Sequence, residues 1–197
     1  MKERKTKQLI TMVVVLAMLM TMTTTAFATG VAPTTAVTGT TDVTIGALAI
    51  ANSAAVSLDG KTKTITFAVT DMTITDARGT GAGWGVSLYA SQFTNATASN
   101  GAINTLPASS LKLGTVAIAI DGTSPDSSSI DTITLGQGTI DTDTAAGVRI
   151  LSAAINGGMG IYTASIGDMT LTLLPKDSKA GTYTSTITMT LTQGPTA

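Results

Sequence analysis

Cysteine and histidine are both absent from the 197-residue sequence. Without cysteine the chain can form no disulfide, no thiolate zinc site and no lipid anchor on a cysteine side chain. Without histidine it lacks the commonest general base near neutral pH, the usual partner of a nucleophilic serine and the commonest metal ligand. These absences exclude most hydrolase mechanisms, and we expect a protein that is not an enzyme and carries no cofactor.

Charged residues are scarce, at 12% of the chain, and glutamate occurs once, at Glu3. Beyond residue 28 the sequence holds seven basic and 11 acidic residues, a formal charge of about −4. The seven basic residues are scattered between Lys61 and Lys179 and form no cluster. Because phosphate backbones bind to a clustered positive face, nucleic acid is not an expected partner.

The N-terminus has the three parts of a secretory signal peptide. Lys2, Arg4, Lys5 and Lys7 precede an apolar run from Leu9 to Met20, and Ala26-Phe27-Ala28 supplies small residues at the spacing of a cleavage site. The run is shorter than the roughly 20 residues that cross a bilayer. We predict a signal peptide over residues 1–28 and no transmembrane segment after its removal, with an uncleaved membrane anchor as the alternative.

The rest of the chain is expected to form one domain made mainly of strands. Residues 29–41 are small, polar and turn-forming, and they predict a flexible leader. Residues 42–197 are rich in Thr, Ser, Ala, Gly, Val and Ile, which favour half-buried pleated surfaces over exposed helices. The C-terminal residues form no hydrophobic tail and no sorting motif, so we expect retention at a surface to depend on binding.

Apolar residues alternate with polar ones in several short segments, which is the pattern of half-buried strands. The clearest segment is 62–70, and the longest predicted strand is 183–191; the others are 84–88, 116–120, 133–135, 148–150 and 169–173. Residues 143–155 fit a strand or a short helix. Short strands separated by turn residues predict an all-β, single-domain β-sandwich or barrel-like fold with little helix.

Three segments resemble the WxL domain family of bacterial surface cell-wall-binding proteins. The first is Val69-Thr70-Asp71 with Asp76 to Val86, which contains the run Asp-x-Arg-Gly-x-Gly-x-Gly-Trp. The second is Leu111-Lys112-Leu113-Gly114, and the third runs from Leu171 to Pro175 and on to Leu191. Both signatures diverge from the family pattern, since Val86 replaces the usual leucine and Met189 replaces the usual tryptophan.

This resemblance implies a secreted protein held without a covalent bond on the cell wall of a Gram-positive-type bacterium. Its expected partners are peptidoglycan, a membrane-anchored surface protein and other wall proteins. A self-assembling subunit of an extracellular fibre or surface layer is the alternative, because an exported β domain can pair through its edges or donate its leader as a strand.

Seven residues are candidates for contact with the wall or a partner, and each also has a structural interpretation. They are Asp76, Arg78, Trp84, Val86, Tyr183, Met189 and Leu191. Trp84, the single tryptophan, is either a core anchor or a platform for sugar rings. Methionine in place of the second tryptophan favours the core. Asp76 and Arg78 either clamp the glycine-rich turn as an ion pair or bind a charged peptide.

No catalytic or metal site is expected from the remaining residues. Glycines 79, 81 and 83 are not followed by the lysine and hydroxyl residue of a phosphate loop. Asp121, Asp126, Asp131, Asp141 and Asp143 raise the question of calcium, which binds clustered oxygens. Aspartates spaced in Ser/Thr/Gly loops more often cap turns, and nothing in their spacing indicates the carboxylate pair of a glycosidase.

Overall fold

The structure, a computed structural model, describes residues 16–22, 28–29, 43–51, 56–96, 103–142 and 146–194. The predicted leader lies outside the described residues, apart from Thr29. No helix in the described part of the chain is long and apolar enough to cross a membrane.

Within these residues the strands form three antiparallel sheets, of which the first has eight strands. Its main path runs β12-β13-β7-β16-β1-β2, and β8 pairs with β16 and with β9. The bounds are β1 Leu16–Met22, β2 Ala28–Thr29, β7 Trp84–Ala90, β8 Thr94–Asn95, β9 Asn104–Thr105, β12 Ile133–Leu135, β13 Val148–Ala153 and β16 Thr182–Gln193.

The other two sheets have the orders β10-β15-β5 and β11-β14-β6-β4. Their bounds are β4 Val43–Ile45, β5 Lys63–Phe67, β6 Met72–Asp76, β10 Leu111–Lys112, β11 Ala117–Ile120, β14 Gly160–Ser165 and β15 Met169–Leu173. Each of three chain segments passes from one sheet to the other after a short break: β5 continues into β6, β10 into β11 and β14 into β15. The two small sheets therefore form one interrupted layer.

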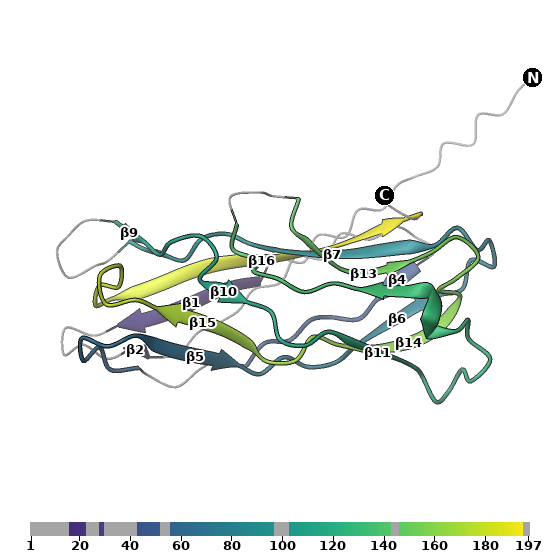
Figure 1. Cartoon of the computed structure of the whole chain (residues 1–197), viewed down its shortest axis with the longest axis horizontal. Helices are drawn as coiled ribbons and strands as arrows, with labels where there is room; N and C mark the ends of the chain where they lie inside the picture. The colour runs from purple at the N-terminus through teal and green to yellow at the C-terminus, as the bar shows by residue number, and fades with distance from the viewer. Residues whose placement is uncertain are drawn as a thin grey trace, which may run out of the picture.

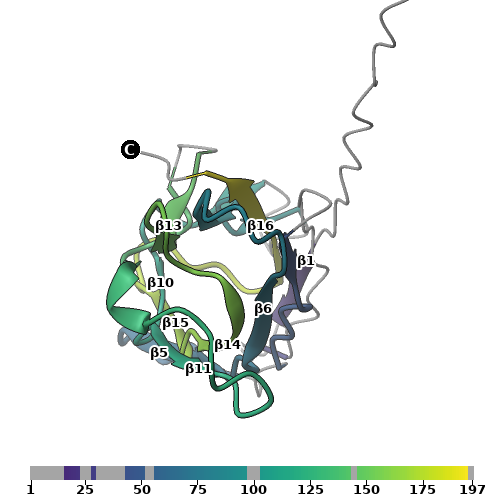
Figure 2. The ribbon, with the colours of Figure 1, turned by 90° about the vertical axis from the view of Figure 1, so that its right-hand side faces the viewer.

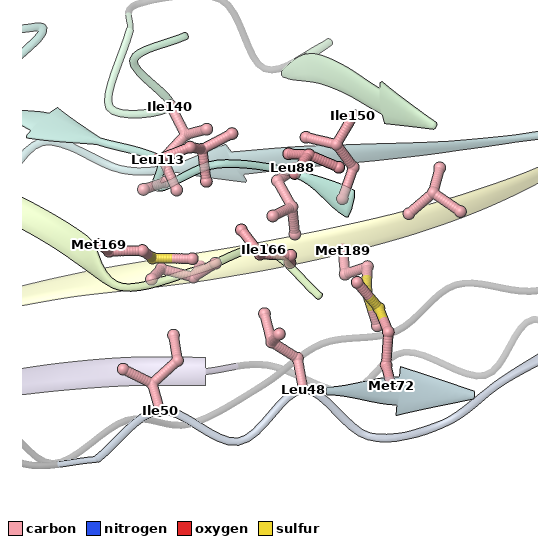
Figure 3. Close-up of a cluster of buried hydrophobic side chains, with 14 of the residues drawn as sticks. Leu48, Ile50, Met72, Leu88, Leu113, Ile140, Ile150, Ile166, Met169 and Met189 are labelled. Atoms are coloured by element: carbon pink, nitrogen blue, oxygen red, sulfur yellow. The ribbon is translucent and has the colours of Figure 1, made fainter. Parts of the chain in front are cut away.

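The eight-stranded sheet and the interrupted layer enclose a continuous apolar core. Seen from one end, the strands surround this core like the wall of a flattened barrel (Figure 2). The core side chains come from both layers: Met189 on β16 points toward Met72 on β6 (Figure 3). The expected all-β sandwich or barrel-like fold is confirmed, and the described helix is one 3-10 turn, Ile130–Thr132.

The alternating pattern located seven of the strands that the structure describes, namely β5, β7, β11, β12, β13, β15 and β16. β16 buries alternate residues from Tyr183 to Leu191, as predicted. Residues 148–153 form a strand, so the helical alternative is wrong over that segment, whereas 143–145 lie outside the described residues. The pattern missed β14, in which Tyr162 and Ala164 are the buried residues, because a small alanine between polar neighbours carries a weak apolar signal.

β1 and Ala28, the first of the two residues of β2, fall within the segment predicted to be a signal peptide. β1 pairs antiparallel with the first half of β16, so in the whole chain this segment is the neighbour of the C-terminal strand (Figure 1). Cleavage of residues 1–28 stays a prediction, and it would leave the described domain without β1.

Candidate functional site

The two signature segments lie side by side in the centre of the eight-stranded sheet. β16 pairs antiparallel with β7, and the register places Leu191 opposite Val86 and Met189 opposite Leu88. Directly opposed residues of an antiparallel pair share one face of the sheet. The four side chains are buried, so the two signatures together build one patch of core.

Trp84, the first residue of β7, is fully buried at the end of this patch. Its indole Nε1–H donates to the Gly158 carbonyl oxygen at 2.8 Å, which satisfies its one polar group. The ring meets the Tyr162 ring in a tilted arrangement with centroids 6.2 Å apart. Tyr162 is held in turn, since its hydroxyl lies 2.8 Å from the Ser128 carbonyl oxygen. The geometry is that of a core anchor.

Asp76 and Arg78 form a bidentate ion pair at the turn before Trp84. Arg78 Nε lies 2.8 Å from Asp76 Oδ1 and Arg78 Nη2 lies 2.7 Å from Asp76 Oδ2. Nη2 also donates to the Gly83 carbonyl oxygen at 2.7 Å. Only 6% of the Arg78 side chain and 1% of the Asp76 side chain are exposed. The pair thus clamps the two ends of the glycine-rich turn together.

The turn needs glycine at the position that leads into β7. Gly83 has φ of +71°, and a Cβ there would lie 2.5 Å from the Ala153 carbonyl oxygen. The backbone must therefore pass close to the end of β13, and no side chain fits between them. The neighbouring Gly81 accepts a hydrogen bond from the Asn156 N–H at 2.7 Å, which fastens the turn to the loop after β13.

Tyr183 anchors the opposite end of β16. Its side chain is fully buried, and its hydroxyl accepts a hydrogen bond from the Lys179 N–H at 2.8 Å. The Asn104 side-chain amide donates to the same hydroxyl. All seven candidate residues are thus enclosed in the fold, and a direct contact of their side chains with a wall polymer stays a prediction.

Among the described residues, no three acidic side chains gather closely enough to hold a metal ion. Asp121 accepts hydrogen bonds from the Thr123 hydroxyl and N–H at 2.6 and 2.9 Å. These bonds hold the pKa of Asp121 below its usual value. The Asp131 carboxylate accepts the Ser129 hydroxyl at 3.0 Å, and Ser129 Oγ accepts the Asp131 N–H at 3.2 Å. Both aspartates thus bond within their own turns, while Asp143 lies outside the described residues.

Asp141 differs from the other aspartates because its side chain is completely buried. Oδ2 accepts a hydrogen bond from the Ser110 N–H at 2.8 Å, whereas Oδ1 has no hydrogen-bond partner among the described residues. Burial raises the pKa of Asp141 to about 6, against the hydrogen bonds that lower it. The carboxyl group is therefore a pH-dependent element of stability.

We expect Asp141 to make the domain less stable as the pH rises from about 4 to about 7. Its folded-state pKa lies above the unfolded value of 3.8, so its contribution is fully present below pH 3.8 and is lost as the pH passes through about 6. The loss amounts to about 3 kcal/mol. Urea unfolding of the wild type and of Asp141→Asn across this pH range measures the loss. The free energy of unfolding of Asp141→Asn minus that of the wild type should fall as the pH decreases, because the wild-type carboxyl group then becomes neutral. A constant difference would contradict the prediction.

The structure also reveals exposed apolar side chains that sequence reasoning missed. Ile155 is 64% exposed in the loop after β13, one residue before the Asn156 that bonds to the signature turn. Ile103 is 73% exposed beside β9, at the far end of the sandwich from that loop (Figure 1). Ile155 follows Ala153 and Ala154, so the sequence pattern predicts that it continues the preceding strand and does not indicate its exposure.

Comparison with known proteins gave one finding. A family model described as "WxL domain surface cell wall-binding" matches residues 31–195. Neither a curated protein nor a solved structure matches the chain.

Proposed function

Because the chain belongs to the WxL domain surface cell wall-binding family, we propose that it is exported by its signal peptide and binds peptidoglycan non-covalently. Its location is then the outer face of a Gram-positive-type cell wall, beside a membrane-anchored surface protein and other wall proteins. The family is described by binding rather than by a reaction, and we propose no catalytic role.

The extent of the family match carries this proposal. Residues 31–195 cover almost the whole chain after the predicted cleavage site, which supports our assignment of the family's binding property to this β domain. In this view the wall contacts the surface of the sandwich, and the buried signature residues stabilise the fold beneath that surface.

The end of the sandwich that carries the signature turn is the surface that we propose for wall contact. The loop after β13 is fastened to this turn by the hydrogen bond from Asn156 N–H to Gly81 O, and it presents Ile155 to solvent. The turn beneath is held by the ion pair of Asp76 and Arg78. A rigid turn with one exposed apolar residue offers a contact for sugar rings and for the alanine methyl groups of wall peptides.

Sedimentation of the exported protein with purified peptidoglycan sacculi tests the proposal. Wild-type protein should pellet with the sacculi, and Ile155→Ser should raise the Kd for sacculi by about fivefold, which corresponds to about 1 kcal/mol. Ile103→Ser is the matched control, because it removes another largely exposed isoleucine at the other end and should bind like the wild type.

A salt series accompanies this measurement, since a contact made by apolar and hydrogen-bonding groups should change little with ionic strength. Wild-type protein that stays in the supernatant at every salt concentration would overturn direct wall binding. An equal loss in both isoleucine variants would overturn the proposed contact surface and leave wall binding intact.

A further inference from the structure

β16 has a long edge without the features that usually protect an edge strand. Its 12 residues contain no charged residue and no proline. Proteins commonly use lysine, proline or a bulge to stop an exposed edge from pairing with another chain. On the side away from β7, the half of β16 from Thr182 to Ile187 is covered by β1, with which it pairs antiparallel (Figures 1 and 2).

The hydrogen bonds of Thr186 show which backbone groups face β1. Thr186 donates its N–H to Ser91 Oγ at 2.8 Å and accepts the Ser91 N–H at 2.8 Å, so both of its groups point toward the β7 side. Backbone groups of successive residues point to opposite sides of a strand. Tyr183, Ser185 and Ile187 consequently direct theirs toward β1, where the register places them opposite residues 20, 18 and 16.

β1 is also the part of the sheet that the proposed export removes. Cleavage after Ala28 takes away all of β1 together with Ala28, one of its two partner residues in β2. The three residues that face it have side chains in the core, and they are buried in the chain that contains β1. Among the described residues β1 is the strand that covers this edge, so its removal would leave the six backbone N–H and C=O groups of Tyr183, Ser185 and Ile187 available to a new strand.

We propose that the edge from Thr182 to Ile187 of the exported protein accepts an extended, uncharged, apolar segment of a partner surface protein as an added antiparallel strand. The segment takes the place of β1, whose composition defines the chemistry: six of its seven residues are apolar. Strand addition gives affinity through main-chain hydrogen bonds. The leader of this chain lacks that character, since six of its 13 residues are threonine and only four are alanine or valine. This inference rests on the proposed export and not on wall binding.

The test uses the protein released from the cell surface, with its N-terminus identified by mass spectrometry. The probe is a peptide of residues 15–23 flanked by lysines for solubility. Amide hydrogen exchange is measured at Tyr183, Ser185 and Ile187, with and without the peptide. Exchange should be fast without it and at least about tenfold slower with it. The control peptide carries N-methyl groups at residues 16, 18 and 20, which removes the N–H groups that pair with β16.

Each other outcome overturns the proposal in a distinct way. An N-terminus that still includes residues 16–22 means that the edge is never open. Slow amide exchange without the peptide means that the edge is already covered. Sedimentation then distinguishes the two causes: a monomer indicates the chain's own leader, and a dimer indicates a second copy of the chain. Equal protection by the N-methylated peptide means that binding does not use the strand edge. None of these results depends on whether the protein pellets with sacculi, so the two proposals fail separately.

Discussion

Trp84→Ala is expected to lower the free energy of unfolding by about 3–5 kcal/mol, the range for truncating a large buried aromatic residue. The side chain is fully buried, and its removal leaves a cavity against Tyr162 and an unpaired Gly158 carbonyl oxygen. For a domain of this size the melting temperature should fall by roughly 10 °C. Urea and thermal unfolding of the exported protein measure both quantities.

Trp84→Phe separates the packing of the ring from its hydrogen bond. Phenylalanine retains most of the contact with Tyr162 but cannot donate to the Gly158 oxygen, which costs about 1–3 kcal/mol. If the folded Trp84→Phe protein pellets with sacculi like the wild type, the tryptophan acts through the fold. Lost wall binding with an unchanged melting temperature would place the indole at the ligand instead. An alanine variant as stable as the wild type would contradict the core assignment.

Arg78→Met is expected to have the second large effect, again about 3–5 kcal/mol, because it leaves the Asp76 carboxylate buried without its partner charge. The Gly83 carbonyl oxygen keeps one donor, the Gly194 N–H at 3.0 Å. The unpaired carboxylate therefore dominates the loss. Unfolding in urea at neutral pH measures it, and a higher exchange rate in the turn should accompany it.

The double variant Asp76→Leu with Arg78→Met tests the cause of that loss. Replacing both buried charges by apolar groups removes the desolvation penalty, so the double variant should be at least about 2 kcal/mol more stable than Arg78→Met alone. Lys63→Met is the matched control, since its ion pair with Asp59 is exposed and should contribute less than about 1 kcal/mol. Additive losses in the double variant would show that each side chain acts independently.

Strand content and the buried face of each strand followed from local patterns. The alternation from Tyr183 to Leu191 was sufficient to predict β16, because one face of a strand must be apolar when it covers a core. The same reasoning left Asp76 and Arg78 with two interpretations, since an ion pair and a ligand site require the same two side chains. Their separation of 2.7 Å and their burial identify the clamp.

The surface that we propose for wall contact could not be predicted in this way. Ile155 reads as a continuation of β13, and its exposure depends on where the chain turns after Ala153. The pairing of the two signatures is a similar case. They lie about a hundred residues apart, and a period of two in each strand does not specify which strand becomes its neighbour.

By itself, the sequence determined the all-β class, the apolar faces of the main strands and membership of the wall-binding family, because these depend on residue types and short spacings. Only the tertiary structure decided that the signature residues lie in the core, that Asp141 is buried with its Oδ1 unpaired among the described residues, and that β1 pairs with the first half of β16. The reason is physical: burial and strand pairing arise from contacts between distant segments, and these contacts are set by how two layers pack, which no local pattern records.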